Sequence, residues 1–268
     1  MKKSVSLYYL FASLLLVLLP SHAKSAEEII EVDVNGTIRR ALVITPDRAK
    51  AGEQLPLVFV FHGRTGSMEG AAKRMAIHQH WSEAIAVYPQ GLRVESGRFK
   101  GAGWVMPTAS NQGRDIAFFD TLLSELSKRY NIDKQRVYAM GHSNGGGFTH
   151  ALWAVRGEHL AAVAPSASGA GNLGGIAALQ QPKPIFFTAS KEDDIVSMAN
   201  IQKCINRALK TNHCKRGKKI SKNLTLYKGE DGADVAVYIH NGGHKFCADI
   251  LPLVARFFAK HKNKNLAE

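Results

Sequence analysis

The sequence predicts an α/β fold in which helices cover both faces of a mostly parallel central sheet. Apolar runs of strand length alternate with amphipathic, helix-like segments along most of the 268 residues. Several of these runs are apolar at nearly every position, which is typical of parallel strands buried on both faces. A hairpin signal near the N-terminus predicts an antiparallel edge of the sheet.

Residues 1–23 have the pattern of a cleavable secretory signal peptide. A lysine pair precedes an apolar stretch from Leu7 to Leu19, and small residues stand near the expected cleavage site. The stretch is shorter than the roughly 20 residues that a membrane span needs. We therefore expect a secreted protein, extracellular or periplasmic, whose residues 24–268 form a single domain.

The elements of this domain follow from local patterns, taken in chain order. Residues 31–46 predict two strands joined at Asn35-Gly36, since both turn residues tolerate positive φ. Asp115 begins a helix to Tyr130, where we expect its carboxylate to cap the first backbone amides. The other predicted strands are 55–63, 84–91, 136–140, 160–167, 184–190 and 234–240, and the other helices are 67–79, 148–155 and 250–258.

The segment Gly141-His142-Ser143-Asn144-Gly145 lies between a predicted strand and a predicted helix. This is the setting of a nucleophile elbow, a sharp turn in which glycines two positions either side of a serine let strand and helix pass closely. The alternative interpretation is a glycine-rich helix start. We favour the elbow, which makes Ser143 the candidate nucleophile.

A serine hydroxyl needs a base to take its proton and a carboxylate to orient that base. Asp193 follows the strand at 184–190, and His244 follows the strand at 234–240. Ligands gather beyond the carboxyl ends of parallel strands, so we expect these side chains to meet Ser143 there. The chain order serine, acid, histidine is also one that such triads use.

Neighbouring residues offer alternatives for both partners. Glu192 and Asp194 compete as the acid, and we prefer Asp193 because Ile195-Val196 then follows it as hydrophobic support. His240 competes as the base but ends the predicted strand, whereas two glycines before His244 allow a close approach to the serine.

Acyl transfer builds negative charge on the carbonyl oxygen, which backbone amides can stabilise. The amide of Asn144 stands at a helix start, where the helix dipole favours an anion. The amide of Arg64 follows His62-Gly63 at the end of a buried strand, and Gly63 gives the backbone room. We expect these two amides to form an oxyanion hole, and the alternative for His62-Gly63 is an ordinary turn.

The formal net charge is +13 at pH 7, which favours anionic surroundings. We take the lysines and arginines to be spread along the chain, and they are not interleaved with aromatic residues, so we expect no nucleic-acid groove. On this interpretation the charge serves solubility and loose adsorption to anionic surfaces.

Three cysteines, Cys204, Cys214 and Cys247, lie in the last third of the chain. An exported protein can oxidise two of them. Pairing Cys204 with Cys214 requires the helix between them to end first, because a continuous helix separates their Cα atoms by about 15 Å. Pairing Cys214 with Cys247 is the competing possibility.

These motifs resemble those of the α/β-hydrolase esterases that include poly(3-hydroxybutyrate) depolymerases, feruloyl esterases and acetylxylan esterases. The resemblance covers nearly all of residues 24–268 and rests on the blocks at 55–63, 87–91, 103–104, 114–146, 193–196 and 242–244. It implies the catalytic residues Ser143, Asp193 and His244 and the oxyanion amides of Arg64 and Asn144. It also places Trp104 near the substrate, and we expect His62 and His142 to bind substrate as well.

The chain departs from the family pattern at three points. Members usually follow the catalytic histidine with tryptophan and proline, where this chain has Phe246 and Cys247. A small residue or cysteine often stands in the place of Arg64. Many members also have a cysteine near the position of Glu230 that pairs with the counterpart of Cys214.

The sequence thus predicts a secreted serine carboxylic-ester hydrolase that works through an acyl-enzyme, with no metal or cofactor. Its substrate is expected to be a hydroxyalkanoate oligomer or polymer, or a hydroxycinnamoyl or acetyl ester of polysaccharide. Two alternatives are a catalytically silent exported binding protein on the same scaffold and a serine peptidase.

Overall fold

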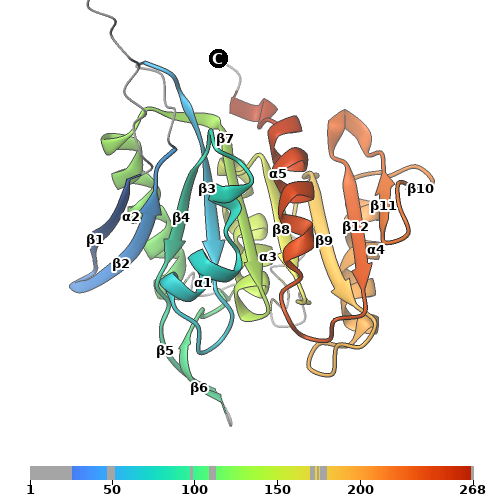
Figure 1. Ribbon diagram of the computed structural model, residues 1–268, viewed down its shortest axis with the longest axis horizontal. Helices are drawn as coiled ribbons and strands as arrows, with labels where there is room; N and C mark the ends of the chain where they lie inside the picture. The colour runs from blue at the N-terminus through green and yellow to red at the C-terminus, as the bar shows by residue number, and fades with distance from the viewer. Residues whose placement is uncertain are drawn as a thin grey trace, which may run out of the picture.

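The computed structural model describes residues 26–46, 52–96, 99–108, 113–169, 173, 175 and 180–266 (Figure 1). The signal peptide expected at residues 1–23 lies outside this part of the chain. Within it, no helix combines the length and the apolar composition that a membrane crossing requires.

The centre of the fold is a ten-stranded sheet with the order β1-β2-β4-β3-β7-β8-β9-β12-β11-β10. The six strands from β4 to β12 run parallel, and the two strands at each edge are antiparallel. The bounds are β1 Glu27–Val34, β2 Thr37–Ile44, β3 Leu55–Phe61, β4 Ile85–Pro89, β7 Ile132–His142, β8 Ala162–Ser166, β9 Ile185–Ser190, β10 Lys218–Lys219, β11 Leu224–Tyr227 and β12 Val235–His240. A separate hairpin pairs β5 Leu92–Ser96 with β6 Phe99–Gly103. The predicted mostly parallel sheet with an antiparallel N-terminal edge is confirmed.

Five α-helices of the described chain cover the two faces of the sheet (Figure 1). Helices α1 Met68–Arg74 and α5 Leu251–Lys260 pack on one face, and α2 Gly113–Arg129, α3 Asn144–Arg156 and α4 Met198–Thr211 pack on the other. Short 3₁₀ turns occupy Ile77–Gln79, Gly157–His159, Glu230–Gly232, Ala248–Ile250 and Lys264–Leu266. The core therefore has two layers, one on each side of the sheet.

The N-terminal hairpin forms at the predicted turn. Asn35 and Gly36 have φ angles of 53° and 81°, the left-handed values that a two-residue hairpin turn requires. The carboxylate of Asp33 accepts a 2.7 Å hydrogen bond from the amide of Gly36. The register pairs Val34 with Thr37, so the turn fixes which side chains face the core.

Asp115 does not precede the helix as the sequence suggests. It lies inside α2, and its buried Oδ1 accepts a 2.9 Å bond from Arg39, while Oδ2 accepts from the amide of Val105. The Arg39 guanidinium also lies 4.0 Å from the ring centre of Phe118. The partner of Asp115 comes from a distant strand, so no local pattern could indicate it.

The predicted helix over 67–79 is also shorter than expected. Helix α1 ends at Arg74, Met75 leaves the helical conformation, and a separate 3₁₀ turn follows at Ile77–Gln79. The side chains of Met75 and Ile77 are both buried in the layer under α1, so packing against the sheet takes precedence over continuation of the helix.

No disulfide joins Cys204, Cys214 and Cys247, all of which lie in the described part of the chain. Helix α4 does end before Cys214, with Asn212 as its C-cap, as pairing with Cys204 would require. Cys204 and Cys214 pack on the core layer under α2 to α4, whereas Cys247 packs on the opposite layer. The sheet therefore separates Cys247 from the other two thiols.

Candidate active site

Four loops meet at the carboxyl edge of the parallel strands, the lower edge in Figure 1. The loop after β3 carries Arg64, the turn after β7 carries Ser143, the loop after β9 carries Asp193, and the loop after β12 carries His244. Parallel strands bring these loops together although they are far apart in the sequence.

Ser143 occupies a strained backbone conformation between β7 and α3, with φ 55° and ψ −118°. A Cβ atom on Gly141 would lie 2.4 Å from the carbonyl oxygen of Gly145, and one on Gly145 would lie 2.2 Å from that of Phe61. Both distances are far inside van der Waals contact, so the turn needs glycine on both sides. These are the features of an elbow and not of a simple glycine-rich helix start.

The structure brings Ser143, His244 and Asp193 into one hydrogen-bonded chain. The Oγ of Ser143 lies 2.8 Å from Nε2 of His244, and Nδ1 of His244 lies 2.8 Å and 3.0 Å from the two carboxylate oxygens of Asp193. The Asp193 side chain is fully buried, and 16% of the His244 side chain is exposed. The imidazole can thus exchange a proton with the serine on one side while the carboxylate orients it on the other.

Backbone amides hold Asp193 in place. Its Oδ1 accepts 2.9 Å and 2.7 Å bonds from the amides of Ile195 and Val196. Burial alone raises the pKa of Asp193, but bonds from Val196, His244 and Ile195 outweigh it and lower the pKa. The side chain of Ile195 is 62% exposed, whereas that of Val196 packs on the core, so the expected hydrophobic support comes from Val196, and the two amides add to it.

The alternative residues lie elsewhere. Glu192 and Asp194 are exposed, and Nδ1 of His240 accepts a 3.0 Å bond from the amide of Gly242. The hydroxyl of Ser190, at the end of β9, accepts bonds from the amides of Glu192 and Gly243. This hydroxyl therefore links the loop that carries Asp193 to the loop that carries His244.

The two expected oxyanion amides flank the serine. A Cβ on Gly63 would lie 3.5 Å from Cβ of Ser143, so the loop leading to Arg64 passes directly beside the serine. Asn144 is the first residue of α3, where an amide has no acceptor within the helix. The backbone of Trp104 fixes the Asn144 side chain. The amide of Trp104 donates a 2.7 Å bond to Oδ1 of Asn144, and Nδ2 of Asn144 donates a 3.0 Å bond to the carbonyl of Trp104.

Trp104 and His62 are buried beneath the site and are not among the described residues that line the two pockets beside Ser143. Trp104 is 1% exposed, stacks on Phe148, and donates a 2.8 Å bond from Nε1 to the carbonyl of His62. His62 is equally buried, and its Nε2 accepts a 2.9 Å bond from the amide of Gly91. The substrate contact expected of both residues is thus not seen; they fix the loop that carries Arg64.

His142 lies beside His244, with ring centres 5.2 Å apart, and against Phe246. Burial and the nearby His244 lower the pKa of His142 to about 4. The imidazole is therefore neutral near pH 7, and it forms part of the wall of the cleft rather than a second base.

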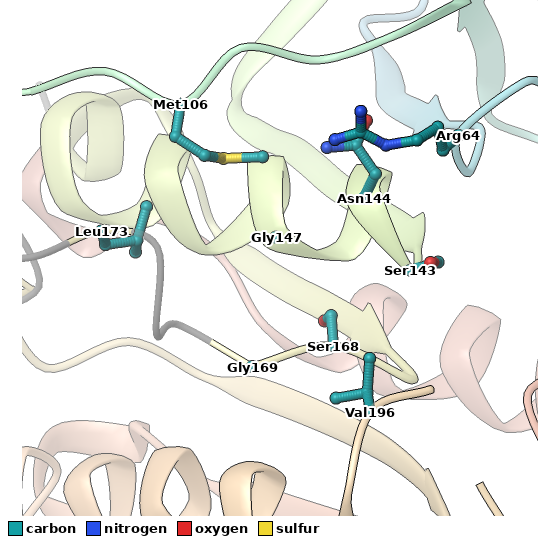
Figure 2. A pocket seen from close by; sticks show the side chains of 9 residues that line it. All are labelled: Arg64, Met106, Ser143, Asn144, Gly147, Ser168, Gly169, Leu173 and Val196. Atoms are coloured by element: carbon teal, nitrogen blue, oxygen red, sulfur yellow. The ribbon is translucent and has the colours of Figure 1, made fainter. Parts of the chain in front are cut away.

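Two of the pockets formed by the described residues have Ser143 in their lining. The first, with a volume of about 280 Å³, is shown in Figure 2 and is lined by Arg64, Met106, Ser143, Asn144, Gly147, Ser168, Gly169, Leu173 and Val196. The second, of about 270 Å³, is lined by Gly63, Arg64, Thr65, His142, Ser143, Asn144, Ile195 and His244. We call them the Met106 pocket and the His244 pocket. Sequence reasoning missed Met106, Leu173 and the side chain of Val196, because no motif marks a pocket wall.

Comparison with known proteins identifies related sequences, although no family model matches the chain. A feruloyl esterase D of Neurospora crassa is 27% identical over 236 residues, which cover 80% of this chain and 77% of that protein. A bifunctional acetylxylan esterase/xylanase of Neocallimastix patriciarum is 31% identical over 59% of this chain and 22% of its own length. A probable feruloyl esterase C of Aspergillus clavatus is 30% identical over 52% of this chain and 48% of its own length.

Solved structures with the same architecture include an acetyl xylan esterase from Aspergillus awamori and a ferulic acid esterase. The first has a TM-score of 0.62 at 16% identity and covers 87% of this chain and 99% of that one. The second has a TM-score of 0.59 at 16% identity and covers 87% and 98%. At these identities the likeness concerns the fold.

Proposed function

Since the chain is an esterase of the α/β-hydrolase class, we propose that it cleaves carboxylic esters through a covalent acyl-enzyme on Ser143. The observation that carries this proposal is the continuous hydrogen-bonded chain from Ser143 through His244 to Asp193. The strained turn at Ser143 supports it, because it presents the hydroxyl at the edge of the sheet.

The chemistry begins with proton transfer. Nε2 of His244 takes the proton of Ser143 while Oγ attacks the ester carbonyl carbon. The carbonyl oxygen becomes an anion, which the backbone amides of Arg64 and Asn144 stabilise. The carbon–oxygen bond to the alcohol then breaks, and the protonated His244 gives its proton to the departing oxygen. A water molecule repeats the sequence on the acyl-enzyme and releases the acid.

Asp193 supports these steps without exchanging a proton. Its lowered pKa keeps the carboxylate ionised near neutral pH. Its bonds to Nδ1 fix the tautomer in which Nε2 of His244 is free to accept a proton from Ser143. The negative charge also stabilises the imidazolium that forms during each transfer.

The position of His244 assigns the two pockets. The departing alcohol oxygen has to reach Nε2 of His244, so the alcohol part of the ester belongs in the His244 pocket. The acyl part then extends into the Met106 pocket on the other side of Ser143. Arg64 and Asn144, whose amides we propose as the oxyanion hole, line both pockets, which supports this assignment.

The size of the Met106 pocket favours a hydroxycinnamoyl group over an acetyl group. Its volume of about 280 Å³ is close to the roughly 300 Å³ of the smaller pockets that hold whole small-molecule ligands, far more than an acetyl group fills. Met106, Leu173 and Val196 give it apolar walls, which suit an aromatic ring. The names of the related feruloyl esterases support the same choice.

We also infer that residues 1–23 direct export, and that residues 24–268 are one catalytic domain acting outside the cytoplasm. The charge and hydropathy pattern of the first 23 residues supports this. The acyl-enzyme route needs no metal or cofactor, because the serine, the imidazole and the amides supply every group the reaction uses.

The test compares the wild type with Ser143→Ala. The wild type should hydrolyse p-nitrophenyl acetate and methyl ferulate and should react with a fluorophosphonate probe at Ser143, while the variant should fold normally and do neither. A folded wild type that escapes the probe would indicate a silent binding protein. Peptide amide cleavage at rates comparable to esters would indicate a peptidase instead.

A substrate panel then decides the acyl group. Methyl ferulate, acetylated xylan and hydroxybutyrate oligomers represent the three candidate classes. The proposal requires the highest kcat/KM on methyl ferulate, and a clear preference for acetylated xylan or the oligomers would contradict it.

A further inference from the structure

The positive charge of the chain is concentrated in one segment. Residues 195–229 include nine lysines and arginines and not a single aspartate or glutamate. This segment supplies +9 of the formal net charge of +13. The excess of cations over carboxylates is therefore concentrated in this segment and is not spread along the chain.

The segment forms one end of the molecule. It comprises helix α4 and the edge strands β10 and β11, which lie together at the right of Figure 1. Its nine cationic side chains are all exposed: Lys203, Arg207, Lys210, Lys215, Arg216, Lys218, Lys219, Lys222 and Lys228. They make a continuous stretch of chain with an exposed positive surface, which we call the basic edge.

The cations of α4 form a stripe. The buried side of the helix carries Ile201, Cys204, Ile205 and Ala208. Lys203, Arg207 and Lys210 have spacings of four and three residues, which align them on the exposed side. The helix dipole accounts for a cation at Lys210, near the C-terminus of α4, but not for one at Lys203.

Most of these charges have no ion-pair partner among the residues that the structure describes. Of the nine, Lys228 alone has an ion pair within the described part of the chain, 2.6 Å from Asp234. Like charges gathered on one edge repel each other and lower the stability of the folded state. A polyanion bound at the basic edge would relieve this repulsion.

The helix that carries the stripe begins close to the active site. Ile195 lines the His244 pocket, and α4 begins at Met198 in the same loop. Lys203 lies about 8 Å along the helix axis from Met198, and Lys210 lies about 10 Å further. A polymeric substrate whose alcohol oxygen occupies the His244 pocket can therefore extend along α4 towards β10.

We propose that the basic edge binds an acidic polysaccharide, and that this polysaccharide is the alcohol part of the ester substrate. Carboxylates repeated along a glycan match cations repeated along Lys203, Arg207 and Lys210. The assignment of the glycan as the alcohol part rests on the proposed function, whereas binding to the basic edge does not.

The surroundings of the stripe favour a glycan over other polyanions. Within residues 195–229, the large apolar side chains that are strongly exposed are Ile220 and Ile195, and Ile195 lines the His244 pocket, which leaves too little apolar surface to insert into a lipid surface. The aromatic residue of this segment, Tyr227, packs against the core, so stacking platforms for single-stranded nucleic acid are absent from it.

A binding experiment tests the inference without catalysis. The probe is polygalacturonate without ester groups, with neutral xylan as the reference. The variant Lys203→Gln/Arg207→Gln/Lys210→Gln removes the stripe, and the control Lys73→Gln/Lys128→Gln/Lys134→Gln removes the same charge from exposed sites on α1, α2 and β7. At low salt the stripe variant should bind polygalacturonate about tenfold more weakly, and the control should stay within twofold of the wild type.

Kinetics and competing ligands complete the test. On feruloylated acidic polysaccharide the stripe variant should show a higher KM, with kcat/KM on methyl ferulate unchanged. Equal losses of polygalacturonate affinity in the stripe variant and the control would overturn the proposal. So would binding of the wild type to anionic vesicles or single-stranded DNA as tightly as to polygalacturonate. Binding by a wild type that hydrolyses no ester would refute the proposed function and leave the basic edge as a binding surface.

Discussion

Asp193→Asn isolates the role of the carboxylate, because the substitution keeps the size and shape of the side chain. In the wild type Oδ1 accepts bonds from the amides of Ile195 and Val196, while Oδ2 faces Nδ1 of His244 at 2.8 Å. The amide side chain has one oxygen, and the two backbone N–H groups hold it at the Oδ1 position. Its NH₂ group is then forced to face Nδ1 of His244.

This orientation selects the wrong imidazole tautomer. Nδ1 has to accept the bond from the new NH₂ group, so the proton of the neutral ring moves to Nε2. Nε2 of His244 can then no longer accept the proton of Ser143. We expect kcat to fall about 10⁴-fold, or about 5 kcal/mol in activation free energy. Both backbone bonds survive, so the free energy of unfolding should change by about 1 kcal/mol at most.

The assay measures kcat and KM on p-nitrophenyl acetate together with the rate of fluorophosphonate labelling at Ser143. Asp194→Asn is the matched control, since this neighbouring carboxylate is exposed, and it should keep wild-type kcat. A kcat for Asp193→Asn within tenfold of the wild type, in a normally folded protein, would refute the proposed role of the carboxylate.

Three further predictions concern the elbow, the acyl pocket and the pH dependence of stability. Gly145→Ala places a Cβ 2.2 Å from the carbonyl oxygen of Phe61 and 2.5 Å from that of His62. The free energy of unfolding, measured in urea, should therefore fall by about 3 kcal/mol. An unchanged free energy of unfolding would contradict the close approach of strand and helix. Met106→Trp narrows the Met106 pocket, so kcat/KM on methyl ferulate should fall about 100-fold, while kcat/KM on p-nitrophenyl acetate should stay within threefold of the wild type. Equal losses of kcat/KM on both esters would place the acyl group elsewhere. Burial lowers the pKa of His150 from 6.5 to about 4. Between these values the unfolded chain binds a proton that the folded chain does not, so stability falls as pH drops from about 6.5 to 4, by up to about 3 kcal/mol. His150→Leu should reduce that loss in urea titrations at pH 7 and pH 4.5, and an equal loss in both proteins would exclude His150 as its source.

Local patterns predicted much of the fold because they act over a few residues. The turn at Asn35-Gly36 needs two residues with positive φ, and the sequence places them between two alternating strands. The small hairpin of β5 and β6 and the edge strands β10 and β11 went unseen, since they lack long apolar runs. Asp115 was misread because its partner, Arg39, lies on another element.

For the site, the sequence could name the residues but not their surroundings. Ser143, Asp193 and His244 follow strand ends in an order that few other arrangements share, so chain order and spacing pointed to them. Sequence reasoning expected Trp104 and His62 to touch substrate, and both are buried under the loop instead. Burial depends on neighbours from other segments, which no single motif contains.

The sequence by itself determined the alternation of strands and helices, the elbow at Ser143 and the charge of the segment from 195 to 229, because each is a property of residues close together in the chain. Only the tertiary structure decided the orientation of His244 towards Ser143 and Asp193, the walls of the two pockets, the lack of a disulfide among the three cysteines and the position of the basic edge beside the cleft. These depend on distances between segments that meet only when parallel strands align, and such distances are fixed by packing of the whole core.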